Sequence, residues 1–189
     1  MNTAPYERME RCADIALRGD LNALPELFSA LADADWQLRY AAAVALGDLH
    51  PKAAVQPLLA ALAIEDAAPL YSQPPLSAGG SAGSGNVTMP EFPAGTTAEQ
   101  IAAWTRRGRL KQAICLALGA VGEGTPEVLA ALHRTAVDAG EDYLVRASSC
   151  KALGLIGSPT SRAVLEQAAK DEEWCTAKEA NKALARLPA

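Results

Sequence analysis

The stretch that decides the fold is Val145-Arg146-Ala147-Ser148-Ser149-Cys150-Lys151-Ala152-Leu153-Gly154, because its pattern recurs along the chain. An aliphatic residue comes first, a basic residue follows, and Ala-Leu-Gly ends the stretch. Residues 38–47 and 110–119 repeat the pattern in the same register, and residues 176–185 carry a degenerate copy. In a helix this spacing places the apolar side chains on one stripe. We predict that the final glycine ends each helix in the left-handed conformation.

A shorter apolar segment precedes each copy and supplies the first arm of a helical hairpin. We expect these first arms at residues 23–32, 53–64, 126–137 and 161–170. A further helix at residues 7–18 is expected to cover the first hairpin, because the ends of a solenoid need caps. The sequence therefore predicts an all-α superhelix of about four hairpins, forming a single domain over residues 1–189.

Composition agrees with a helical interior. Of the 189 residues 50% are hydrophobic and only 5% are aromatic, which favours close-packed helices over sheets. Seventeen Lys and Arg against 22 Asp and Glu give a net charge of −5, so the basic footprint of a nucleic-acid-binding domain is missing. No apolar stretch approaches the roughly 20 residues of a membrane span. We expect a cytoplasmic protein that contacts no membrane.

An insertion interrupts the second repeat. The separation of Gly47 and Gly119 is about twice that of Gly119 and Gly154, and residues 66–96 are rich in Pro, Gly and Ser. This composition predicts a flexible loop. Three apolar residues in it are candidate anchors, by which the loop folds over the solenoid or grips a partner: Tyr71, Met89 and Phe92.

A helix is expected to restart after this loop. Thr96 and Glu99 have the spacing of a capping box, in which each residue bonds the backbone of the other. Acidic-aromatic pairs precede three of the copies, but the second repeat lacks one. We expect Trp104 to take the place of the missing ring.

The pattern quoted above resembles the HEAT-like repeats of phycobilisome lyase subunits, and the likeness covers most of the chain outside residues 66–105. The last copy departs from it at Ala177 and Ala185, as expected for a C-terminal cap. The resemblance implies that second arms line the concave side of the stack. The outward positions of the second arms are then candidate partner-binding residues: Tyr40, Val44, Asp48, Gln112, Leu116, Ala120, Ala147, Lys151, Leu155, Lys178, Lys182 and Arg186.

These positions form an apolar strip that ends in a basic edge, which suits an amphipathic or acidic peptide. The alternative is ordinary scattered surface. Arg39 and Arg146 follow the aliphatic positions and are expected to be structural, pairing with Asp35 and Asp142 at a spacing of four.

Residues able to support chemistry are few. His50 and His133 belong to no His-Glu pair or HxxxH spacing, and the four cysteines form no CxxC pair, so neither a metal nor a cofactor is predicted. Cys115 and Cys150 share a register with Ala43 and Asn181, and we expect all four in a seam of small side chains.

The function predicted from the sequence is a non-catalytic adaptor that binds another protein through the concave face or the insertion, and not an enzyme. One alternative is an accessory subunit for cofactor attachment or maturation, as the phycobilin lyase resemblance implies. A second alternative is a nucleic-acid-binding HEAT-like protein, for which the clustered basic residues at 106–111 and 178–186 are the only support. Partner identity and oligomeric state stay open.

Overall fold

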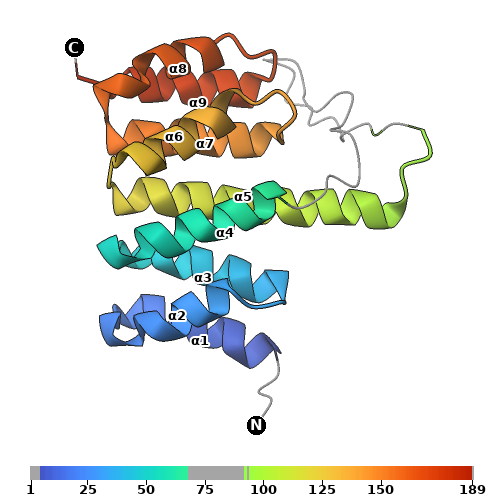
Figure 1. The fold of residues 1–189 in the computed structure, drawn as a ribbon, viewed down its shortest axis with the longest axis vertical. Coiled ribbons are helices and arrows are strands. Elements are labelled where there is room, and N and C mark those ends of the chain that lie inside the picture. Colours follow the sequence, from blue (N-terminus) through green and yellow to red (C-terminus); the bar gives the residue numbers. More distant parts are fainter. Residues whose placement is uncertain (1–4, 68–91, 93, 189) are drawn as a thin grey trace.

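The computed structural model describes residues 5–67, 92 and 94–188, and all regular structure in that part of the chain is helical (Figure 1). The predicted all-α superhelix is confirmed. The helices are α1 Pro5–Arg18, α2 Leu24–Leu31, α3 Trp36–Leu49, α4 Val55–Ala67, α5 Ala98–Val121, α6 Pro126–Val137, α7 Tyr143–Ile156, α8 Arg162–Ala168 and α9 Trp174–Leu184. Most of the predicted 66–96 loop, with Tyr71 and Met89, lies outside the described residues.

The helices form two rows. First arms α2, α4, α6 and α8 make one row, and α1 stacks with second arms α3, α5, α7 and α9 in the other (Figure 1). Helix α1 is therefore an additional second arm. Its buried Cys12 and Ile15 occupy the register of Ala43 and Leu46 in α3. None of the described helices combines the length and the apolar character that a membrane span requires.

Second arms approach one another closely at the repeated glycine. A Cβ atom on Gly119 would lie 2.5 Å from the Cα of Ala152, and one on Gly154 would lie 2.8 Å from the Cα of Ala183. These glycines lie inside α5 and α7, so the prediction that they end their helices is wrong. Consecutive second arms contact one another far more extensively than consecutive first arms do. Since the spacing of packed helices depends on the side chains at the contact, the small residues at these positions account for the close packing of the second arms.

The helix ends lie three residues beyond those glycines. Gly122 and Gly157 adopt the left-handed conformation after α5 and α7, while His50 does so after α3 with φ of 53°. At the start of α5, Thr97 and Gln100 form the capping box. The predicted box of Thr96 and Glu99 is thus displaced by one residue.

The predicted seam of small side chains holds for three of its four members. Ala43, Cys115 and Cys150 are fully buried, whereas Asn181 is exposed because α9 ends the row and has no further neighbour on that side. The cysteines are free thiols. Burial raises the pKa of Cys115 to about 11 and that of Cys150 to about 12, so both thiols stay protonated at neutral pH and act as small core residues.

Candidate partner-binding groove

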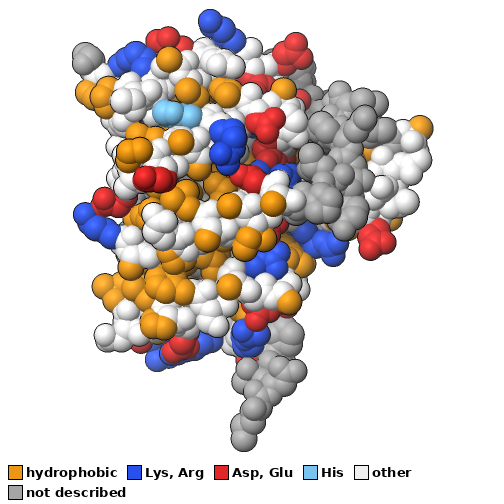
Figure 2. All heavy atoms as spheres, viewed as in Figure 1, with side chains coloured by type: hydrophobic (Ala, Val, Ile, Leu, Met, Phe, Trp, Pro, Cys, Tyr) orange, Lys and Arg blue, Asp and Glu red, His pale blue; other side chains and the backbone are white. Residues whose placement is uncertain are grey.

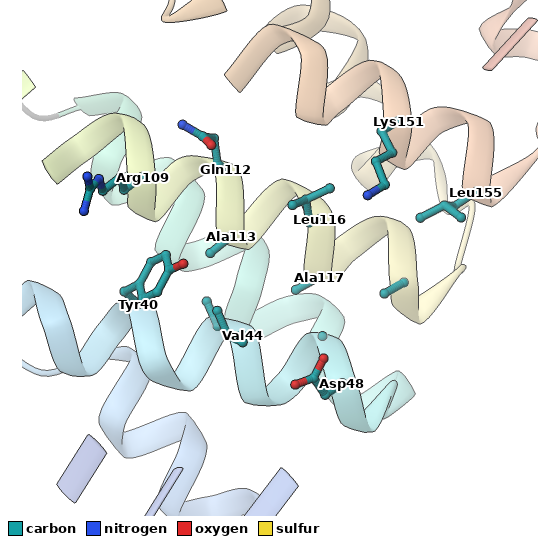
Figure 3. Close-up of a pocket in the computed structure, with 13 residues that line it drawn as sticks. Tyr40, Val44, Asp48, Arg109, Gln112, Ala113, Leu116, Ala117, Lys151 and Leu155 are labelled. Carbon is teal, nitrogen blue, oxygen red and sulfur yellow. The ribbon is translucent and has the colours of Figure 1, made fainter. Parts of the chain in front are cut away.

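A groove of about 500 Å³ crosses three consecutive second arms (Figure 3). Its lining includes eight of the predicted positions: Tyr40, Val44 and Asp48 from α3, Gln112, Leu116 and Ala120 from α5, and Lys151 and Leu155 from α7. They meet because residues four apart share one face of a helix and because the repeats stack in register. The floor is made of small residues such as Ala113 and Ala117, which keep the groove open.

A second cavity extends the groove to α1. It measures about 850 Å³ and shares Tyr40, Val44 and Asp48 with the first. Met9 and Leu17 of α1 complete it, and Leu17 is 85% exposed. The two cavities form one trough over α1, α3, α5 and α7, which we call the second-arm groove. The contribution of α1 to the groove is not predicted by the repeat pattern, although Cys12 and Ile15 keep the repeat register.

The groove leaves apolar side chains in water. Tyr40 and Val44 are each 40% exposed and Leu155 is 47% exposed. Figure 3 shows Tyr40, Leu116 and Leu155 projecting from three different helices into the same space. Contiguous apolar surface of this kind, bordered by polar groups, is typical of interaction sites.

Three charged residues border the groove: Arg109, Lys151 and Asp48. None of them forms an ion pair with another described residue. Arg109 was not among the predicted residues, yet it lies three positions before Gln112 and so shares its face. Two cations without an ion pair to any described residue therefore lie over α5 and α7, and one such carboxylate lies at the end of α3.

One basic side chain from each of α1, α3, α5 and α7 takes part in a ladder of ion pairs between successive repeats. In each pair a basic residue of one second arm reaches an acid of the next repeat: Arg8 with Asp33, Arg39 with Glu65, Lys111 with Glu141, and Arg146 with Asp171. The prediction that Arg39 and Arg146 pair with Asp35 and Asp142 is wrong. Both of those aspartates instead accept backbone hydrogen bonds at helix starts.

The centre of the ladder is buried. Lys111 is 2% exposed and contacts both Glu141 and Asp66, with 2.6 Å between its Nζ and an oxygen of Asp66. Arg134 reaches the other oxygen of Asp66, and Arg107 reaches Glu141. Burial alone raises the pKa of Asp66, but Lys111 and Arg134 outweigh it, so that pKa lies below its ordinary value. In Figure 2 basic and acidic side chains lie side by side on the first-arm face.

The predicted basic edge lies on α9, beyond the lining of the groove. Lys178, Lys182 and Arg186 are exposed. The ammonium group of Lys178 lies 4.9 Å from the ring centre of Trp174, and Lys182 pairs with Glu179 at 2.5 Å. Two of the three cations thus already have a partner within α9.

Phe92 is the one predicted anchor of the insertion that the structure describes. Its ring packs edge-on against Trp104 with 5.4 Å between ring centres, so it fastens the segment before α5 to that helix. Trp104 lines a cavity of about 390 Å³ with Asp142 and Tyr143, the acidic-aromatic pair of the next repeat. Burial raises the pKa of Asp142.

The histidines lie apart. His50 ends α3, and the Nε2 of His133 lies 2.9 Å from the hydroxyl of the buried Ser161. Burial lowers the pKa of His133. Within the described residues no group of three His, Cys, Asp or Glu side chains has an arrangement that holds a metal ion.

Comparison with known proteins identifies the family of this chain, because a family model described as HEAT repeats matches residues 2–70 and 100–187. The chain belongs to the HEAT repeat family. The two matched segments leave out most of the insertion, as the repeat spacing predicts. The family match does not extend to the phycobilisome lyase type, and no curated protein matches this HEAT repeat chain.

A solved structure of human deoxyhypusine hydroxylase in complex with glycerol is similar to this HEAT repeat protein at 19% identity and a TM-score of 0.39. The match covers 98% of this chain and 80% of that one. That protein is an enzyme. The prediction that this chain is not an enzyme is therefore corrected. The similarity is too low to assign the hydroxylase activity to this chain.

Proposed function

We propose that this HEAT repeat protein is a scaffold that holds a segment of another protein in the second-arm groove. The observation that carries the proposal is the exposure of Tyr40, Val44 and Leu155 along one open trough. Each leaves apolar surface in water that a partner's side chains would cover, and burial of such surface is the main driving force of protein association. Other exposed apolar side chains, such as Ile64, lie outside this trough.

An accessory role beside a cofactor-attaching enzyme is a special case of the same proposal, because the groove would then hold that enzyme. The lyase-type resemblance of the repeat pattern supports this special case. A chromophore or cofactor in the recovered complex would distinguish it from a simple scaffold.

A crosslinking experiment tests the groove directly. A photoreactive phenylalanine derivative replaces Tyr40, which lines the groove, or Tyr6, an exposed tyrosine of α1 outside the groove. After illumination in the native cell, we expect a discrete crosslinked partner from position 40 and none in common with position 6. Identical adducts from both positions would contradict the proposal.

A second variant checks that the crosslink depends on the groove. Leu155→Asp places a charge on the opposite wall, and we expect it to remove the adduct formed from position 40. Leu144→Asp is the matched control, because Leu144 is a similarly exposed leucine of α7 outside the groove lining. Both variants should retain the helical circular dichroism of the parent.

A further inference from the structure

We propose that the occupant of the second-arm groove is an amphipathic helix of a partner protein, with carboxylates where it crosses α5 and α7. This inference rests on the proposed function and specifies the chemistry of the bound segment. It follows from three properties of the groove: the hydrogen-bonding groups it offers, its length and its charge.

The hydrogen-bonding capacity of the groove favours a helix. An extended peptide needs partners for its backbone N–H and C=O groups, and in known cases a sheet edge supplies them. The groove walls are helices whose backbone bonds are already made, and the described part of the chain contains no strand. Gln112 is the one side-chain amide in the lining between α3 and α7. A helix satisfies its own backbone and presents only side chains, which matches this surface.

The length of the groove fixes the length of the helix. The trough crosses α1, α3, α5 and α7, and packed neighbouring helices lie about 8–10 Å apart. Three such intervals span about 24–30 Å, which corresponds to about 16–20 residues at a rise of 1.5 Å per residue. Apolar residues at positions i, i+3, i+4 and i+7 would face Tyr40, Val44, Leu116 and Leu155.

The charge of the groove is divided along its length. The part between α1 and α3 is lined mainly by apolar residues and has the single carboxylate of Asp48. The part between α5 and α7 has Arg109 and Lys151, neither of which pairs with another described residue. Their charge is opposite in sign to the net charge of −5 that the whole chain carries. Carboxylates of a partner lying over α5 and α7 would pair with them, while a basic segment would be repelled there.

Synthetic peptides test this specificity. Three labelled helical peptides of 18 residues share one leucine stripe and carry four Glu, four Lys or four Gln beside its C-terminal half. Binding to the full-length protein is followed by fluorescence anisotropy at low salt. We expect the Glu peptide to bind about 2- to 30-fold more tightly than the Gln peptide, the range for two exposed ion pairs, and the Lys peptide to bind most weakly.

Charge reversal of the groove supplies the decisive comparison. Arg109→Glu with Lys151→Glu should invert the order, so that the Lys peptide binds more tightly than the Glu peptide. Arg106→Glu with Lys170→Glu changes the net charge equally at exposed positions outside the groove lining and should leave the order unchanged. The Tyr40→Ala and Leu155→Ala variants, which alter exposed residues, should weaken all three peptides.

Several outcomes overturn the inference. One is equal binding of the three peptides, and another is an unchanged order in the Arg109 and Lys151 variant. Self-association that Tyr40→Ala abolishes would identify a second copy of the chain as the occupant instead. If charge reversal has no effect while the crosslink from position 40 persists, the groove holds a partner of other chemistry; the inference then fails and the proposed function stands.

Discussion

Gly119 sets the distance between α5 and α7. A Cβ atom at this position would lie 2.5 Å from the Cα of Ala152, and backbone cannot rotate away as a side chain can. We therefore expect Gly119→Ala to force the two helices apart and to lower the free energy of unfolding by about 1–3 kcal/mol, the usual effect of overpacking. Urea unfolding followed by circular dichroism measures this change.

Gly47 provides the control for that substitution. Its added Cβ would lie 3.3 Å from Ala117, a tight contact that a small shift relieves. Alanine is also favoured over glycine inside a helix by up to about 1 kcal/mol. Gly47→Ala should accordingly be nearly neutral, and equal destabilisation by both substitutions would show that helix approach is not the cause.

The same glycines show what a sequence reveals at this scale. Helical periodicity places Tyr40, Gln112 and Lys151 at equivalent outward positions of their helices, and the HEAT-like resemblance implies that these positions share one surface. Periodicity does not say whether a glycine is needed for a left-handed turn or for a close approach. Gly122 and Gly157, three residues after the repeated glycines, are the ones that adopt positive φ. A second glycine three residues after the repeated one is the feature of the sequence that indicates the helix end.

At the scale of elements, the ion-pair ladder joins each second arm to the next repeat. Lys111 lies at its buried centre between Glu141 and Asp66. Lys111→Met would remove the cation that Glu141 and Asp66 share, and would leave the almost fully buried Glu141 with Arg107 and Asp66 with Arg134. We expect a loss of about 3 kcal/mol in unfolding free energy, the lower end of the usual effect of removing one partner from a buried ion pair. Arg18→Met, which removes an exposed ion pair with Asp14, should cost about 0.5 kcal/mol or less.

The pH dependence of this difference follows from Asp66. Its folded pKa is depressed, so the stability it contributes is complete above the unfolded value of about 3.9 and is lost as the pH falls through the folded value. Without Lys111 that contribution is smaller, because Arg134 still pairs with Asp66. The stability gap between the wild type and Lys111→Met should therefore stay constant from pH 7 to about 5 and narrow as the pH falls through about 4 and below. A gap that stays constant over the whole range would mean that packing, and not charge, explains the loss.

The ion pairs that join neighbouring repeats cannot be predicted from the spacing of residues along one helix. The rule of four favours Asp35 for Arg39, since both lie on one helix. Stacking instead brings Glu65 of the next repeat within 3.0 Å of Arg39, while Asp35 bonds the backbone N–H of Gln37. The repeat that contains Arg39 therefore does not contain the ion-pair partner of this residue. The contribution of α1 to the groove could not be predicted from local spacing either. Glu7 stands where the pattern requires an aliphatic residue, and the shared register becomes visible when α1 is seen stacked on α3.

At the scale of the whole molecule, the groove follows from the close approach of the second arms. Glycine and alanine at the contact positions let these helices approach one another. The face of the second arms therefore consists of closely spaced helices whose outward side chains reach into a common space. A substitution that separates second arms, such as Gly119→Ala, would alter the groove even though Gly119 does not line it.

The stack also determines how the molecule unfolds. Among the described residues the extensive helix contacts join each repeat to its immediate neighbours, so stability is a sum of local terms and the ends open first. Leu165 in α8 and Leu27 in α2 are both fully buried, and truncation of either to alanine removes about 2–5 kcal/mol. In hydrogen exchange, Leu165→Ala should reduce amide protection in α8 and α9 while α1 to α3 keep theirs, and Leu27→Ala should do the reverse. Equal loss of protection from α1 to α9 in both variants would show that the chain unfolds as one unit, and the ladder from Arg8 to Asp171 would then couple the repeats more strongly than nearest-neighbour packing implies.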